Sequence, residues 1–267
     1  MTLEFRILCV GLATYVLGGM MTTAEGEGIA EERFETRVYK SDSGSLPYRL
    51  LRPKDYDASQ RYPLVVFYHG AGERGNDNVK QLVHGMNDFA SDDVMAKYPC
   101  FVIAPQCPEG DQWVDTPWTA DTHKMPEKPT EPMQLSLDLI TSLQAEFSID
   151  ANRLYVTGLS MGGFGTWDVI QRHPNRFAAG VPICGGGDTS FAKQLAQVPI
   201  WAFHGGADSA VKPKRSRDMI EAIKEAGGSP KYTEYPGVGH NSWAATYANR
   251  EMYDWLFSQQ RAAEQSD

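Results

Sequence analysis

The stretch Gly158-Leu159-Ser160-Met161-Gly162 places one serine between two glycines. A strand-like apolar run precedes it and a segment with helical periodicity follows it, so Ser160 falls at a tight strand-to-helix turn. The backbone of such a turn is strained, and residues two positions away on either side must be small. This geometry predicts a hydroxyl raised above the sheet edge as a nucleophile. The alternative is an ordinary turn with a helix-capping serine.

A serine nucleophile needs a general base, and His240 is the best candidate. It lies in the glycine-containing segment YPGVGHNSW, directly after the last predicted strand. A loop histidine is often merely solvated, but its place in chain order favours His240. The other five histidines have different expected positions: His69 and His204 end strands and shape loops, His84 and His173 fall in helical segments, and His123 falls in a proline-rich loop.

The base in turn needs an acid to orient it, and we expect Asp208. Asp208 follows the strand that ends at His204, so the chain order is serine, aspartate, histidine, as in α/β-hydrolases. Asp188, in the segment CGGGD one strand earlier, is the rival. For both aspartates the alternative role is to cap a loop turn.

Two backbone N–H groups are required to bind a developing oxyanion. Met161 supplies one because it follows the serine at the start of a helix. The second is expected from the loop HGAGERGND, with Ala71 as the first choice and Gly72 as the next. Glu73 and Arg74 in the same loop are candidates to contact a polar substrate, and the alternative for them is a solvated or structural ion pair.

The elements that must position these residues alternate between strand and helix. Strand-like runs occur at residues 34–40, 46–53, 63–69, 100–105, 153–158, 178–184, 198–205 and 231–236. Apolar stripes of helical period lie between or after them, at residues 135–147, 219–223 and 252–256. The alternation predicts a mostly parallel sheet with helices on both faces and an antiparallel N-terminal strand pair.

One segment interrupts the alternation. Residues 106–132 are proline-rich, lack periodicity and contain Trp113 and Trp118. They leave the carboxyl end of a predicted central strand, which is the edge where open α/β sheets place their sites. A loop of this length is usually functional or mobile. We therefore expect an active-site loop, with Trp113, Trp118 and Trp243 as candidate pocket walls; the alternative for each tryptophan is a core or anchoring role.

The N-terminus predicts export. A short polar start with Arg6 precedes an apolar run, and small residues follow it, so residues 1–24 are interpreted as a signal peptide cut near Ala24. An uncleaved anchor is the alternative. Residues 25–34 form a charged leader, and residues 35–267 form one α/β domain. The formal net charge of −9 argues against nucleic acid and anionic membranes as partners.

The cysteines and carboxylates show no metal-ligand spacing, so neither a metal nor a cofactor is expected. Outside the predicted signal peptide the chain has Cys100, Cys107 and Cys184. We expect buried thiols, and a Cys100–Cys107 bridge is the alternative.

The segments FYHGAGERGNDN, APQCPEG, NRLYVTGLSMGGFGTW, HGGADSAV and GHNSW together resemble secreted esterases of the α/β-hydrolase superfamily. This group, often labelled predicted peptidases, is related to polyhydroxybutyrate depolymerases, feruloyl esterases and the catalytic domain of prolyl oligopeptidases. The resemblance covers nearly all of the chain after the predicted signal, and it implies a triad of Ser160, Asp208 and His240. Dienelactone hydrolases carry cysteine as nucleophile, whereas this chain has Ser160.

The predicted function is that of an exported serine hydrolase that cleaves carboxylic esters through an acyl-enzyme. A small-molecule or glycan-linked ester is the expected substrate. A serine peptidase acting on short peptides is the first alternative, and a non-catalytic binding module on a hydrolase scaffold is the second. No stable membrane insertion is expected after signal cleavage, and oligomeric state is not predicted.

Overall fold

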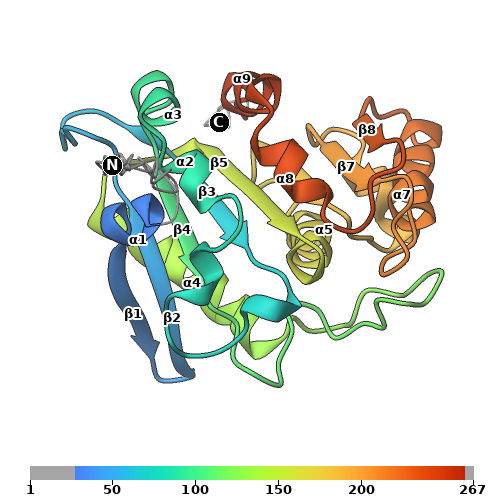
Figure 1. The fold of residues 1–267 in the computed structure, drawn as a ribbon, viewed down its shortest axis with the longest axis horizontal. Coiled ribbons are helices and arrows are strands. Elements are labelled where there is room, and N and C mark those ends of the chain that lie inside the picture. Colours follow the sequence, from blue (N-terminus) through green and yellow to red (C-terminus); the bar gives the residue numbers. More distant parts are fainter. Residues whose placement is uncertain (1–27, 262–267) are drawn as a thin grey trace, which may run out of the picture.

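An eight-stranded sheet forms the centre of the molecule (Figure 1). The computed structural model describes residues 28–261. In sheet order the strands are β1 (Glu35–Ser41), β2 (Gly44–Leu51), β4 (Phe101–Pro105), β3 (Tyr62–Tyr68), β5 (Ile149–Leu159), β6 (Ala179–Ile183), β7 (Trp201–Gly205) and β8 (Lys231–Tyr235). The β1–β2 and β2–β4 pairs are antiparallel, and all pairs from β4 to β8 are parallel. The predicted α/β-hydrolase architecture is confirmed.

Helices cover both faces of this sheet. One face packs against α4 (Glu131–Glu146), α5 (Met161–Arg172), α6 (Ala192–Leu195) and α7 (Lys214–Glu225). The other packs against α1 (Ile29–Arg33), α2 (Met86–Phe89), α3 (Asp92–Lys97), α8 (Ser242–Tyr247) and α9 (Arg250–Ser258). Three short 3₁₀ turns complete the elements: η1 (Ala71–Glu73), η2 (Lys80–Leu82) and η3 (Thr189–Phe191).

The central strand β3 is apolar because neither of its faces meets water. Every residue of β3 is buried. Leu64 and Val66 contribute to the core beneath α4 and α5, whereas Val65 and Phe67 contribute to the core beneath α8 and α9. This alternation explains a run of apolar residues without a polar face. The more polar strand β8 lies at the edge of the sheet, as its sequence predicts.

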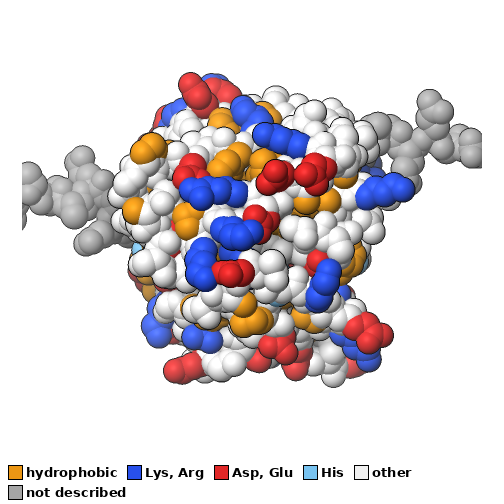
Figure 2. Space-filling model, turned by 90° about the vertical axis from the view of Figure 1, so that its right-hand side faces the viewer, with side chains coloured by type: hydrophobic (Ala, Val, Ile, Leu, Met, Phe, Trp, Pro, Cys, Tyr) orange, Lys and Arg blue, Asp and Glu red, His pale blue; other side chains and the backbone are white. Residues whose placement is uncertain are grey.

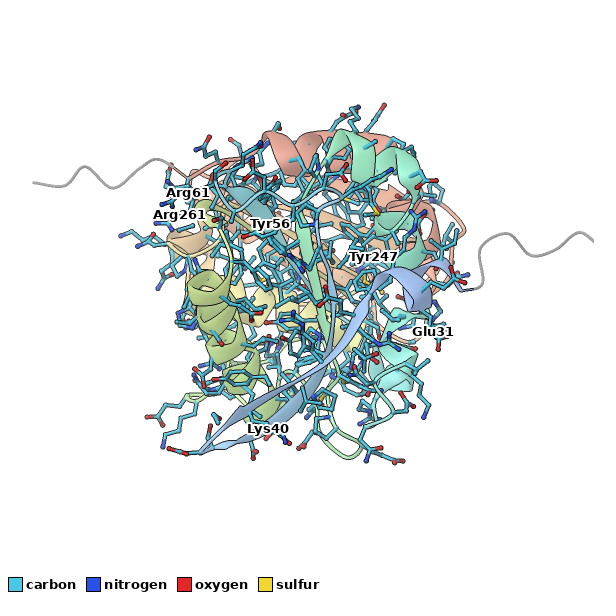
Figure 3. All side chains as sticks on the ribbon, turned by 90° about the vertical axis from the view of Figure 1, so that its left-hand side faces the viewer. Glu31, Lys40, Tyr56, Arg61, Tyr247 and Arg261 are labelled. Carbon is cyan, nitrogen blue, oxygen red and sulfur yellow. The ribbon has the colours of Figure 1, made fainter. Side chains whose placement is uncertain are left out.

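The N-terminal part of the described chain packs onto the domain. Residues 29–33, within the predicted charged leader, form α1, and Ala30 and Phe34 are buried in the core. In Figure 3 the edge of the sheet formed by the β1–β2 hairpin faces the viewer, with Lys40 near the tip of the hairpin. The predicted signal peptide lies outside the described residues. Within residues 28–261 there is no helix with both the length and the apolar character needed to cross a membrane.

The three cysteines of the described chain are free and buried, so the expectation of buried thiols is confirmed and the Cys100–Cys107 bridge is not formed. The face that carries α7 and β8 shows acidic and basic side chains side by side (Figure 2). Ion pairs such as Lys214–Asp218 and Arg217–Glu234 account for part of this mixing.

Candidate active site

Ser160 joins β5 to α5 in a strained conformation. Its φ of 53° and ψ of −118° lie outside the regions that non-glycine residues ordinarily adopt. Its N–H donates to the carbonyl of Ile183 on the neighbouring strand, at 3.0 Å, which fixes the turn against β6. The predicted strand-to-helix elbow is therefore present, and Ser160 remains partly accessible at its tip.

The glycines around the elbow are required by backbone contacts. A Cβ atom on Gly158 would lie 2.6 Å from the carbonyl oxygen of Tyr68, and one on Gly162 would lie 2.7 Å from that of His69 and closer still to that of Tyr68. A Cβ on Gly163 would overlap the carbonyl of Ile183. Because all these neighbours are backbone atoms of β3 and β6, they cannot move aside easily.

His240 links Ser160 to Asp208. Its Nε2 lies 2.8 Å from Ser160 Oγ, and its Nδ1 lies 2.7 Å from Asp208 Oδ2. A carboxylate only accepts hydrogen bonds, so Nδ1 carries the proton and Nε2 presents its lone pair to the serine hydroxyl. The His240 side chain is 28% exposed, whereas that of Asp208 is fully buried. The arrangement can therefore withdraw a proton from Ser160.

The Asp208 carboxylate is held from several directions. Oδ1 accepts the N–H groups of Ala210 and Val211 at 2.9 and 3.0 Å, and Oδ2 faces His240 and His204. Burial alone would raise the pKa of Asp208, but these hydrogen bonds outweigh it and hold the pKa well below its usual value. Asp208 is therefore ionised at neutral pH.

The rival aspartate has a different role. Asp188 caps η3 through Ser190 N–H and accepts the N–H of Met125 at 3.0 Å. Although burial would raise its pKa, the hydrogen bonds from Met125 and Ser190 lower it. Asp188 thus anchors the loop of residues 106–132, which Figure 1 shows in green, running past α5 toward α7.

Buried arginines hold the same loop. Arg215 donates to the carbonyl of Ala120 at 2.7 Å and contacts His123, and Arg172 donates to the carbonyl of Pro126 at 2.6 Å. Burial, followed by the nearby charge of Arg215, lowers the pKa of His123 to about 4, so this ring is neutral at neutral pH. The proline-rich loop is consequently tied down along its length.

The expected oxyanion-hole donors come from the starts of two helical elements. Met161 is the first residue of α5 and Ala71 is the first of η1, and the first N–H groups of a helix have no acceptor inside it. Gly72 follows Ala71 and is exposed. Arg74 donates to the carbonyls of Ala71 and Asp111, so its guanidinium braces this loop.

His69 also braces the loop. Its Nδ1–H donates to the carbonyl of Gly70 at 2.6 Å, and its Nε2 accepts the N–H of Cys107 at 2.9 Å. Burial is the main cause that lowers the pKa of His69 from 6.5 to about 4. Protonation would convert Nε2 into a donor facing another donor, so the fold requires the neutral ring.

Stability is therefore expected to fall in mild acid. Because the unfolded chain binds a proton at His69 more readily than the fold does, this site contributes stability above pH 6.5 that is lost as the pH falls toward about 4. The loss is about 3 kcal/mol over that range. Urea unfolding of wild type and His69→Asn at several pH values across this range measures how steeply the unfolding free energy of each depends on pH. Equal slopes would contradict the assignment.

The three predicted wall tryptophans have different environments. Trp113 is fully buried, contacts the Tyr68 ring at 4.7 Å between centroids, and donates to the carbonyl of His69. Its prediction as a pocket wall is wrong, because its ring packs against those of Tyr68 and His69 and has no exposed surface. Trp118 is partly buried against the core. Trp243 lies beside the base, with its ring centroid 5.3 Å from that of His240.

Trp243 borders a polar pair, His84 and Glu73, that the sequence does not predict. The His84 ring lies 5.2 Å from the Trp243 ring between centroids, and His84 Nε2 lies 3.6 Å from Glu73 Oε1. Glu73, a predicted substrate contact, thus approaches Trp243 through His84. The expectation that His84 falls in a helical segment is wrong, because His84 lies in the bend between η2 and α2, and no local pattern places it beside Trp243.

Other candidate sites are less suited to this chemistry. A cavity of about 420 Å³ is lined by Pro174, Phe177, Gln194 and neighbouring residues, none of which belongs to the elbow or its partners. Cys184, Asp208 and His240 place ligand-type atoms within 4.8 Å of one another. However, burial raises the pKa of the Cys184 thiol, which disfavours the thiolate that a metal ion would need. Asp208 and His240 already share a hydrogen bond, so these three groups are poorly suited to bind a metal ion.

The family model of the dienelactone hydrolases matches residues 83–266, which include Ser160, Asp208 and His240. The chain belongs to the dienelactone hydrolase family. Within the α/β-hydrolase superfamily, this member has a serine rather than a cysteine at the elbow.

Individual relatives are consistent with this family. A thermostable esterase of known crystal structure is 42% identical, with a TM-score of 0.80 over 86% of this chain and 64% of its own. A bifunctional acetylxylan esterase/xylanase of Neocallimastix patriciarum is 25% identical over 47% of this chain and 18% of its own length. Carboxylesterase SOBER1 of Arabidopsis thaliana is 25% identical over 66% of this chain and 82% of its own. The chain thus spans less than two thirds of the length of the first two of these relatives.

Proposed function

We propose that this protein is an exported serine hydrolase of carboxylic esters that works through an acyl-enzyme. The observation that carries the proposal is the line of hydrogen bonds from Ser160 through His240 to Asp208, at 2.8 and 2.7 Å. Relatives named as esterases support the bond type.

In the proposed reaction Ser160 Oγ attacks the ester carbonyl carbon while His240 Nε2 takes its proton. Asp208 stabilises the imidazolium, and the N–H groups of Met161 and Ala71, or of Gly72, bind the oxyanion. His240 then gives the proton to the departing alcohol oxygen. Water, deprotonated by His240, releases the acyl group and restores the serine.

Peptide hydrolysis by the same residues is the competing function. Rates on p-nitrophenyl acyl esters and on peptide anilides, measured with wild type and Ser160→Ala, separate the two. We expect turnover of the esters to exceed that of the anilides. A preference for anilides would reverse the assignment, and failure of a fluorophosphonate to label Ser160 would favour the non-catalytic binding module.

The part of the site that would receive the leaving alcohol of the ester has features that fit a sugar. The leaving alcohol must approach His240 Nε2 to receive its proton, and the Trp243 ring stands beside this imidazole. Beyond it lie His84, 33% exposed, and the Glu73 carboxylate, which is only 14% exposed and whose Oε2 is buried without a hydrogen-bond partner within the described residues. The aromatic ring and the accessible His84 imidazole together match the apolar and hydroxyl groups of a glycan-linked ester.

Trp243→Leu is expected to raise KM for an acetylated xyloside about 3- to 10-fold, because stacking against an aromatic ring contributes about 0.5–1.5 kcal/mol. KM for ethyl acetate should change less, since its leaving alcohol has no ring that could stack on Trp243. Trp243→Phe, which keeps a ring, serves as the matched control. Equal effects on both substrates would remove the case for a sugar subsite and leave ester hydrolysis unaffected.

Export rests on residues 1–24, which lie outside the described structure. Expression with the native leader, followed by N-terminal sequencing of the exported protein, tests it. The expected mature start is Glu25. Retention of the uncleaved chain in the cell would contradict it.

A further inference from the structure

Asp208 faces two histidines. His240 Nδ1 lies 2.7 Å from Oδ2, and His204 Nε2 lies 3.3 Å from the same oxygen. His204 is fully buried near the end of β7, whereas His240 comes from the loop after β8. A buried polar ring beside a buried carboxylate must have its hydrogen bonds satisfied.

The protonation of His204 Nε2 follows from its neighbours. This nitrogen lies 2.9 Å from the carbonyl of Val211 as well as 3.3 Å from Asp208 Oδ2. Both oxygens can only accept, so Nε2 must carry a proton. One N–H therefore faces both the carboxylate and the main chain three residues after it.

The opposite side of the ring is fixed too. His204 Nδ1 lies 2.8 Å from Ser216 Oγ, and that hydroxyl lies 3.2 Å from the carbonyl of Gly185. Ser216 belongs to α7 and Gly185 follows β6. With the ring proton on Nε2, His204 Nδ1 accepts the Ser216 hydroxyl, so α7 holds the side of the ring opposite Asp208.

These contacts define the loop that carries the acid. Asp208 Oδ1 is held by the N–H groups of Ala210 and Val211, which leaves Oδ2 to meet the two histidines. Since His204 binds the carbonyl of Val211 while it faces Oδ2, it fixes both ends of this short turn.

We propose that His204 is a positioning residue of the triad, whose Nε2–H orients the Asp208 carboxylate toward His240. The inference rests on the proposed function, because the role concerns catalysis by Ser160. It assigns His204 a part beyond that of ending a strand.

The role has an electrostatic consequence. A donor at Oδ2 draws the negative charge of the Asp208 carboxylate away from its bond to His240. When this donor is lost, more of the carboxylate charge acts on His240. The other groups near this pair are the Cys184 thiol, next to Asp208 and His240, and Glu234, which is paired with Arg217 and Tyr232. None of these groups changes when His204 is replaced.

Two amide variants separate the two sides of the ring. His204→Gln can place its amide N–H near the position of Nε2, whereas the shorter amide of His204→Asn reaches only the Ser216 side. We expect the Gln variant to keep kcat within about threefold and the Asn variant to lose on the order of 10- to 100-fold with little change in KM. The acidic limb of the pH profile of kcat/KM should move to higher pH in the Asn variant.

A double-mutant cycle with Asp208→Asn tests whether His204 acts through the acid. The effect of His204→Asn should largely vanish in that background. A merely structural role predicts equal losses in the Gln and Asn variants, an unmoved pH profile, or an undiminished effect in the Asp208→Asn background, and any of these would overturn the proposal.

If neither amide variant folds, ¹⁵N NMR of the histidines in wild type decides: a deprotonated His204 Nε2 would overturn it. Wild-type ester hydrolysis stands apart from all these outcomes, so failure here differs from failure of the proposed function.

Discussion

Ser160→Ala is expected to lower kcat for p-nitrophenyl acetate by about 10⁶-fold, because the acyl-enzyme cannot form without the Oγ atom. The residual rate comes from substrate binding and from oxyanion stabilisation by Met161 and Ala71. Folding should persist, since the change removes one partly accessible hydroxyl and its bond to His240. The free energy of unfolding should therefore stay within about 1 kcal/mol of wild type.

Ser229→Ala is the control for this variant. Ser229 is exposed between α7 and β8, so its replacement should leave kcat unchanged. Activity of Ser160→Ala within tenfold of wild type would show that another group attacks the ester.

Gly162→Ala is expected to cost about 4 kcal/mol or more of unfolding free energy, with loss of activity. The new Cβ would lie 2.7 Å from the carbonyl oxygen of His69 and closer to that of Tyr68. Both oxygens belong to the backbone at the end of β3, so relief requires α5 to move away from the sheet. Such a shift displaces Ser160 from His240. Urea unfolding and kcat together measure the effect.

Gly239→Ala is the matched comparison, because a Cβ there meets no atom within 4 Å. We expect its stability to change by less than about 1 kcal/mol. Equal destabilisation by the two substitutions would contradict the steric account of the elbow.

The elbow and the chain order of the triad could be predicted because their signals are local. The apolar run to Gly158, the turn at Ser160 and the helical pattern after it specify strand, turn and helix within about twenty residues. His240 and Asp208 follow parallel strands, whose carboxyl ends share one edge of the sheet.

The residues that support the site could not be predicted, because their partners lie far away in the sequence. His84 meets Trp243, and Asp188 meets Met125, only after the chain has folded. Trp113 shows the same limit: its position in a polar, proline-rich loop indicates exposure, yet that loop folds back and buries the ring against Tyr68. Tertiary packing decides such cases, and no local pattern records it.

The most direct test of the account is to trap the acyl-enzyme. Wild type is mixed with p-nitrophenyl acetate, quenched in acid within milliseconds, digested and examined by mass spectrometry. The account predicts one acetyl group, carried by Ser160, and almost none in His240→Ala, where the hydroxyl loses its base. An acetyl group on another residue, or equal labelling of Ser160 without His240, would contradict it.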